Sequence, residues 1–85
     1  MLELEFSKNS SKFLKKCEKE ITKRILEKIE KLCTNPFLQD CKRVEGRAEK
    51  VFRIRIGDYR VLYIILKEEN KLLVSSIDKR ERAYD

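Results

Sequence analysis

The chain has 85 residues, of which 42% are charged and 41% hydrophobic, so it can fold around one modest core beneath a highly charged surface. It carries 21 basic and 15 acidic residues, a net charge of +6. It has no histidine and only two glycines, which excludes Ser-His-Asp and Cys-His catalysis and a Gly-rich phosphate loop. No stretch approaches the roughly 20 apolar residues of a membrane span, and no signal-peptide pattern opens the chain. We expect one cytoplasmic domain over residues 1–85.

The cysteines argue against metal and redox chemistry. The three of them, Cys17, Cys33 and Cys41, are odd in number and show no CxxC spacing. A zinc site without histidine would need carboxylates as well as thiolates. Because Cys17 and Cys33 fall on apolar helix positions, we interpret them as small core residues in a reducing compartment. The sequence therefore predicts no cofactor and no metal.

The first part of the chain predicts a short strand followed by helix. Apolar and acidic side chains alternate over residues 2–6, which is typical of a strand with one buried face. Apolar side chains then recur at helical spacing, at Leu14, Cys17, Ile21, Ile25, Ile29 and Leu32. One helix over Ser10–Cys33 would be roughly 36 Å long, whereas a domain of this size has a radius of gyration of about 12 Å. We therefore predict two helices, with a break near Cys17–Glu20.

The second part predicts strands and turns. Asn35-Pro36 ends the helical region, and residues 37–50 are predicted to be irregular, with a turn at Gly46. A hairpin over Val51–Tyr63 follows, and a turn at residues 68–70 leads to a last strand, Leu72–Ile77. The order β-α-α-β-β-β predicts an α+β domain in which a small antiparallel sheet packs against an N-terminal helix pair.

The hairpin places arginines where a sheet would not favour them. A two-residue turn at Gly57-Asp58 would pair Arg55 with Arg60, with Arg53 two residues along the same face. The opposite face is apolar and holds Phe52, Ile54, Ile56, Tyr59, Val61 and Tyr63, so we interpret its two tyrosines as core residues. Like charges directly opposite each other destabilise a sheet. The pattern therefore predicts a bound anion, for which phosphate is the obvious candidate.

The charge distribution favours a nucleic-acid partner. Residues 42–60 hold seven basic and three acidic side chains, a net charge of +4, and so contain most of the excess. Arginines can hold a scissile phosphate and stabilise the charge that builds on it, while RNA supplies its own nucleophile, the 2′-hydroxyl. Metal-free RNA cleavage is therefore feasible. Passive binding of RNA or DNA is equally compatible with these residues.

Two segments of the sequence resemble a known family. RVEGRAEKVFRIRIGDYRVLYII and the later SSIDKRERAY are similar to the RelE toxins of the RelE/ParE superfamily, in order and in spacing. The resemblance implies a small sheet packed on two helices. It also implies a type II toxin that cleaves mRNA in the ribosomal A site without metal, by 2′-hydroxyl attack that gives a 2′,3′-cyclic phosphate. The implied partners are the ribosome, its mRNA and a RelB-like antitoxin that covers the basic site.

The resemblance also implies roles for single residues. Arg53 and Arg55 occupy positions where well-known RelE toxins have lysines, and Arg60 would stabilise the phosphate. Arg80 matches a residue assigned to phosphate contact or leaving-group protonation, and Tyr84 matches a tyrosine that stacks on a base or aids nucleophile activation.

A general base is not among the arginines. An arginine side chain is not deprotonated in proteins, so Arg53 and Arg55 stay protonated at neutral pH. Lys50 and Lys79 are the substitutes that the sequence offers, and with Arg82 they are also the expected RNA-binding residues.

Two other functions remain open at this point. A ParE-like toxin would inhibit DNA gyrase and leave RNA intact. A non-catalytic relative would bind RNA with salt-dependent affinity and leave it uncut.

Overall fold

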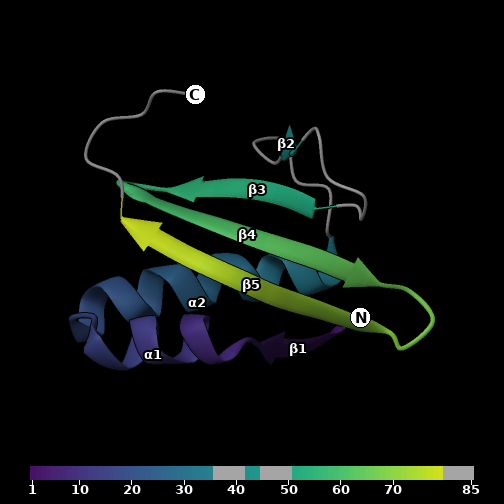
Figure 1. Ribbon diagram of the computed structural model, residues 1–85, viewed down its shortest axis with the longest axis horizontal. Coiled ribbons are helices and arrows are strands. Elements are labelled where there is room, and N and C mark those ends of the chain that lie inside the picture. The colour runs from purple at the N-terminus through teal and green to yellow at the C-terminus, as the bar shows by residue number, and fades with distance from the viewer. Residues whose placement is uncertain (36–41, 45–50, 80–85) are drawn as a thin grey trace.

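In the part of the chain that the structure describes, five strands form one sheet, and two helices cover one of its faces. The computed structural model describes residues 1–35, 42–44 and 51–79. In chain order its elements are β1 (Glu3–Phe6), α1 (Lys8–Lys16), α2 (Lys19–Thr34), β2 (Lys42–Arg43), β3 (Val51–Ile56), β4 (Tyr59–Leu66) and β5 (Lys71–Lys79). The strand order is β1-β5-β4-β3-β2, and α1 and α2 lie on the same side of the sheet (Figure 1). The predicted α+β class, with a helix pair on a small sheet, is confirmed.

The sheet is mixed, so the prediction of a wholly antiparallel sheet is wrong at one edge. The strand β1 runs parallel to β5, with Leu4 opposite Leu72 and Phe6 opposite Val74. A parallel pair needs a long crossover between its strands, and the segment from α1 to β4 supplies it. The two-residue strand β2, opposite Phe52 and Arg53, lies in the region that we predicted to be irregular.

The predicted helix break is confirmed. The helix α1 ends at Lys16 and α2 begins at Lys19. Cys17 between them has an extended backbone (φ −76°, ψ 154°). Its N–H donates to the carbonyl oxygens of Phe13 and Leu14, which closes the last turn of α1. The chain therefore reverses without glycine or proline.

Neither helix in the described part of the chain is long and apolar enough to cross a membrane.

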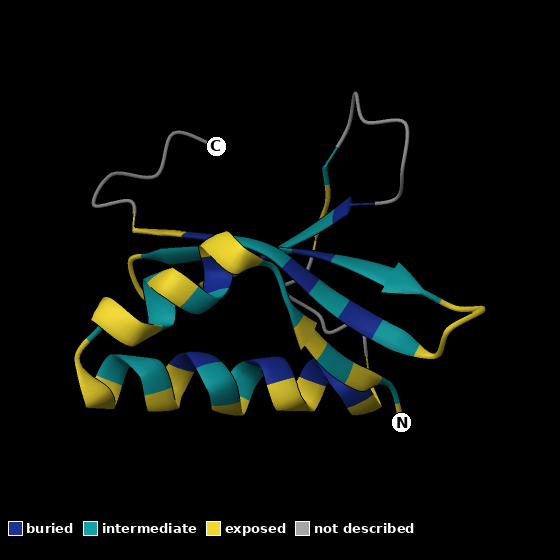
Figure 2. Cartoon of the chain, turned by 60° about the horizontal axis from the view of Figure 1, so that its bottom comes forward, coloured by how far each residue is buried: buried dark blue, intermediate teal, exposed yellow. Residues whose placement is uncertain are grey.

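The core lies between α2 and the helix-covered face of the sheet. The buried residues of α2 lie on the side of the helix that faces the sheet, and exposed residues lie on its outer side (Figure 2). The fully buried core residues are Ile25, Ile29, Leu32, Ile54, Val61, Tyr63, Leu72 and Val74. Cys33 is also buried, as the sequence predicted, whereas Cys17 lies between the two helices and is only partly buried.

A β-bulge shifts the register between β4 and β5. Tyr63 lies opposite Val74, whereas Leu62 lies opposite Ser76, so Ser75 is the extra residue of β5. A bulge reverses the alternation of side chains for the rest of its strand. It is for this reason that Ile77 enters the core at 4% exposure.

Two serines at the start of α1 hold the bulge. The Ser7 hydroxyl caps α1 by accepting from the Ser10 N–H, and it donates to the Ser75 carbonyl oxygen at 2.8 Å. Ser10 is fully buried, and its hydroxyl donates to the Val74 carbonyl oxygen at 3.0 Å. The helix start and the strand irregularity therefore stabilise each other.

Candidate nucleic-acid interface

The sheet face away from the helices, here called the open face, carries the three hairpin arginines. Arg55 lies directly opposite Arg60, and Arg53 lies opposite Leu62, as the sequence predicted. The turn at Gly57 has φ +61°, a conformation that favours glycine. The two-residue turn fixes this register, so three guanidinium groups start from neighbouring positions on β3 and β4.

Apolar side chains share the open face with these arginines. Val51 is buried at 3% exposure, and Leu62 beside Arg53 is partly buried. Arg55 is exposed, whereas Arg53 and Arg60 are partly buried, and the Nε atom of Arg60 is buried. Apolar surroundings strengthen electrostatic attraction, because less water screens the charges. The arrangement therefore suits a multiply charged anion better than fully solvated arginines would.

Asp78 is a residue of this face that sequence reasoning missed. It lies opposite Arg60 on β5, so one row across three strands reads Arg55, Arg60, Asp78. The row carries one net positive charge rather than two, and part of the repulsion is offset within the protein. An external anion would therefore be attracted by Arg53 and Arg55 more than by Arg60, which lies beside Asp78.

The structure does not bring Lys79 to the arginines. Lys79 lies opposite Tyr59 at the end of β5, and Tyr59 faces the helices, where its ring meets Phe13 edge-on at 5.9 Å. Lys79 therefore starts from the other face of the sheet. The other predicted site residues, Lys50, Arg80, Arg82 and Tyr84, lie outside the described residues.

The buried tyrosine is structural, as expected. Tyr63 is fully buried, and its ring stacks on Phe52 at 5.7 Å with an interplanar angle of 24°. Its position between the sheet and α2 keeps it away from the open face, so it has no access to a ligand there.

The thiols of Cys17 and Cys33 are poorly suited to nucleophilic or metal chemistry. Burial raises the pKa of Cys33, and the neighbouring carboxylate of Glu30 adds to this effect. Burial likewise raises the pKa of Cys17, with Glu18 as the second cause. Within the described ranges, no group of three or more His, Cys, Asp or Glu residues could hold a metal ion.

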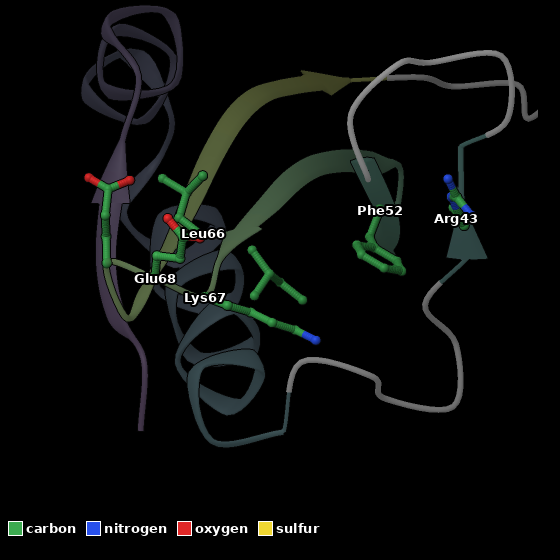
Figure 3. Close-up of a pocket in the computed structure, with 7 residues that line it drawn as sticks. Arg43, Phe52, Leu66, Lys67 and Glu68 are labelled. Atoms are coloured by element: carbon green, nitrogen blue, oxygen red, sulfur yellow. The ribbon is translucent and has the colours of Figure 1, made fainter.

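A groove of about 510 Å³ lies at the end of the sheet where β4 turns toward β5. Phe52 and Arg43 stand at one end of it and the Leu66–Glu68 segment at the other (Figure 3). Its described lining contains none of the predicted site residues. The lining consists of apolar, basic and acidic side chains. It is therefore separate from the arginine cluster.

Sequence comparison identifies the family. The family model described as ParE toxin of type II toxin–antitoxin system matches residues 4–84. A protein assigned as toxin RelE1 of Methanocaldococcus jannaschii is 37% identical over 84 residues, which cover 95% of this chain and 92% of that protein. The chain therefore belongs to the RelE/ParE superfamily of type II toxin–antitoxin toxins.

Solved structures agree with this assignment. The archaeal RelE–RelB complex from Pyrococcus horikoshii has a chain that matches with a TM-score of 0.82 at 27% identity, over 96% of this chain and 98% of that one. The isolated RelE toxin of Escherichia coli matches with a TM-score of 0.83 over 99% of this chain and 89% of that one; at 21% identity it supports the fold alone. Both show that a small sheet covered by two helices is the shared architecture.

Proposed function

We propose that this chain is a ribosome-dependent mRNA endonuclease that works without a metal ion. The observation that carries the proposal is the convergence of Arg53, Arg55 and Arg60 on one face of the β3–β4 hairpin. Membership of a toxin family supports it, and relatives named RelE are the most informative among the matches.

The arginines suit the chemistry of RNA cleavage. The 2′-hydroxyl of the substrate attacks the adjacent phosphorus, the bond to the 5′-oxygen breaks, and a 2′,3′-cyclic phosphate and a 5′-hydroxyl result. Negative charge builds on the phosphate oxygens along the way, and guanidinium groups pair with such oxygens in a planar, two-pronged geometry. A preorganised group of this kind contributes about 10²–10³ in rate. We assign phosphate binding and charge stabilisation to Arg53, Arg55 and Arg60.

Proton transfer needs other groups, because arginine stays protonated. We assign activation of the 2′-hydroxyl to Tyr84 or Lys50, and phosphate contact or protonation of the leaving oxygen to Arg80. Lys79 and Arg82 would contact the RNA backbone. Lys79 would do so from the sheet end, since the register puts it opposite Tyr59 rather than among the arginines.

The proposed protein partner is a RelB-like antitoxin. The matching structure from Pyrococcus horikoshii is a complex of RelE with RelB, and a RelBE2 toxin–antitoxin complex from Mycobacterium tuberculosis matches with a TM-score of 0.79 at 25% identity, over 93% of this chain and 98% of that one. The open face combines arginines with partly buried Leu62 and Ile64. An antitoxin segment with acidic and apolar side chains would cover both and so block the site.

Primer extension on mRNA bound to translating ribosomes tests the proposed activity. The wild-type protein should produce cuts at fixed codon positions, and Arg60→Ala should reduce them about 10²- to 10³-fold. Arg43→Ala is the matched control, because this exposed arginine lies opposite Phe52 and outside the open-face cluster. Undiminished cuts by Arg60→Ala would overturn the assigned mechanism.

A ParE-like inhibitor of DNA gyrase is the second candidate. The observation in its favour is the matching family model, whose description is that of a ParE toxin. Gyrase supercoiling assays with the purified chain separate the two functions. Inhibited supercoiling with intact ribosomal mRNA favours the gyrase inhibitor, and codon-positioned cuts with unaffected supercoiling favour the endonuclease.

A further inference from the structure

The outer surface of α1 carries a second concentration of positive charge. Four of its nine residues are lysines, all of them exposed, and the helix contains no acidic residue. They are Lys8, Lys12, Lys15 and Lys16, here called the α1 lysine stripe. Spacings of three, four and eight residues place them on one side of the helix, over a length of about 12 Å.

The first turns of α2 extend this surface. Lys15 of α1 lines the same groove of about 550 Å³ as Lys19 and Lys23 of α2. Residues 8–23 hold six basic and two acidic side chains, a net charge of +4, which equals that of residues 42–60. Glu27 and Glu30 also line the groove, farther along α2, so the lining carries negative charge there.

The start of the stripe does not serve the stability of α1, whereas its end does. Lys8 sits in the first turn, where the helix dipole favours acidic side chains and where this helix has none. Lys15 and Lys16 lie in the last turn, where the dipole favours basic side chains. The pairs Lys8–Lys12 and Lys12–Lys16 are like charges four residues apart, an arrangement that destabilises a helix. Within the described part of the chain, no ion pair involves any of the four lysines. The positive charge of Lys8 and Lys12 is therefore gathered at a cost to the helix, and a polyanion would remove that cost.

The stripe lies on the other side of the sheet from the arginines. The helix α1 covers the face opposite the open face (Figure 1). It is held firmly there, because buried Ser10 donates to the Val74 carbonyl oxygen and the Phe13 ring meets Tyr59. A small anion therefore cannot contact the α1 lysine stripe and the arginines of the open face at the same time; only an extended polyanion that passes around the sheet could do so.

We propose that the α1 lysine stripe, together with Lys19 and Lys23, is a second RNA-binding surface that contacts the phosphate backbone of double-helical RNA. Lysines on a helix present point charges without the planar fork of arginine, which suits sequence-independent backbone contact rather than catalysis. The inference deepens the proposed ribosome-dependent activity: the stripe would hold structured RNA of the ribosome while the arginines meet the mRNA.

The salt dependence of binding to a labelled 20-base-pair RNA duplex tests this proposal. Each lysine–phosphate contact contributes about 0.9 to the slope of log affinity against log salt. The double variant Lys12→Gln/Lys16→Gln should therefore lower the slope by about 2. Raising the salt from 50 to 200 mM should then weaken the wild type about tenfold more than the variant. The matched control is Lys31→Gln/Lys67→Gln, which removes two exposed lysines outside the stripe and should leave the slope within about 0.5 of wild type.

Equal slopes for the wild type and Lys12→Gln/Lys16→Gln would overturn the proposal, as would a wild type that does not bind the duplex. An unchanged RNA slope together with weaker binding of a purified antitoxin would assign the stripe to a protein partner instead. The duplex assay has no cleavage readout. Failure of the proposed endonuclease would appear in primer extension and leave this result standing.

Discussion

The two faces of the sheet are built from the same strands but differ in their side chains: one face is mainly buried and apolar, and the other carries arginines. On the helix-covered face, Ile54, Val61 and Tyr63 are fully buried against α2. On the open face, Arg55 and Arg60 lie opposite each other, and Asp78 beside Arg60 offsets part of the repulsion between them. The comparison teaches that one face maintains the fold while the other is free to hold unfavourable charge, and strand alternation lets a single hairpin do both.

The largest effect on stability is expected on the helix-covered face. Tyr63→Ala removes the largest fully buried side chain among the described residues and its stacking on Phe52. The free energy of unfolding should fall by about 3–5 kcal/mol, measured by urea denaturation. Tyr63→Phe is the control that keeps the ring and should lose much less. A loss below about 1 kcal/mol for Tyr63→Ala would show that this face is not the principal source of stability.

A smaller loss is expected where α1 meets the bulge. Ser10→Ala deletes the buried hydroxyl that donates to the Val74 carbonyl oxygen, at a cost of about 1–2 kcal/mol in unfolding free energy. Amide exchange at Ser75 and Ser76 should quicken, because the serine bonds secure the bulge. Ser11→Ala in the same helix turn is the matched control. Equal effects of the two substitutions would show that the Ser10 contact does not stabilise the bulge.

The smallest effect is expected for an ion pair at the sheet edge. Glu5 and Lys71 approach to 3.7 Å, with side chains 50% and 32% exposed. Such exposed pairs contribute about 0.2–1 kcal/mol, so Glu5→Gln should reduce the unfolding free energy by no more than that, and less at high salt. A loss above about 2 kcal/mol would mean that charge pairing contributes substantially to stability. The stability of the fold would then not come mainly from the helix-covered face.

The sequence predicted those features that local rules determine. The Gly57-Asp58 turn determined the Arg55–Arg60 pair, and the length of a single helix compared with the size of the domain indicated that the helical region is broken. The bulge at Ser75 depends on tertiary contacts from α1, so no pattern within β5 revealed it. Without that extra residue, alternation from the turn would have put Lys79 on the open face and Asp78 on the other. One bulge therefore explains both the missed carboxylate and the displaced lysine.

The parallel pairing of β1 and the second basic surface were missed for related reasons. The partner of an edge strand is decided by how the helix pair returns the chain, which residues 2–6 do not encode. The lysines of α1 were hidden because the charge of residues 1–41 includes acidic residues from β1 and α2. Only the fold shows that these acids lie elsewhere.

The rate of mRNA cleavage by Arg60→Ala at saturating ribosomes, measured beside its free energy of unfolding, tests the division of labour between the faces most directly. The division predicts a rate about 10²- to 10³-fold below wild type, with the unfolding free energy lowered by less than about 1 kcal/mol. A rate within threefold of wild type, or a rate loss accompanied by a comparable loss of stability, would contradict it.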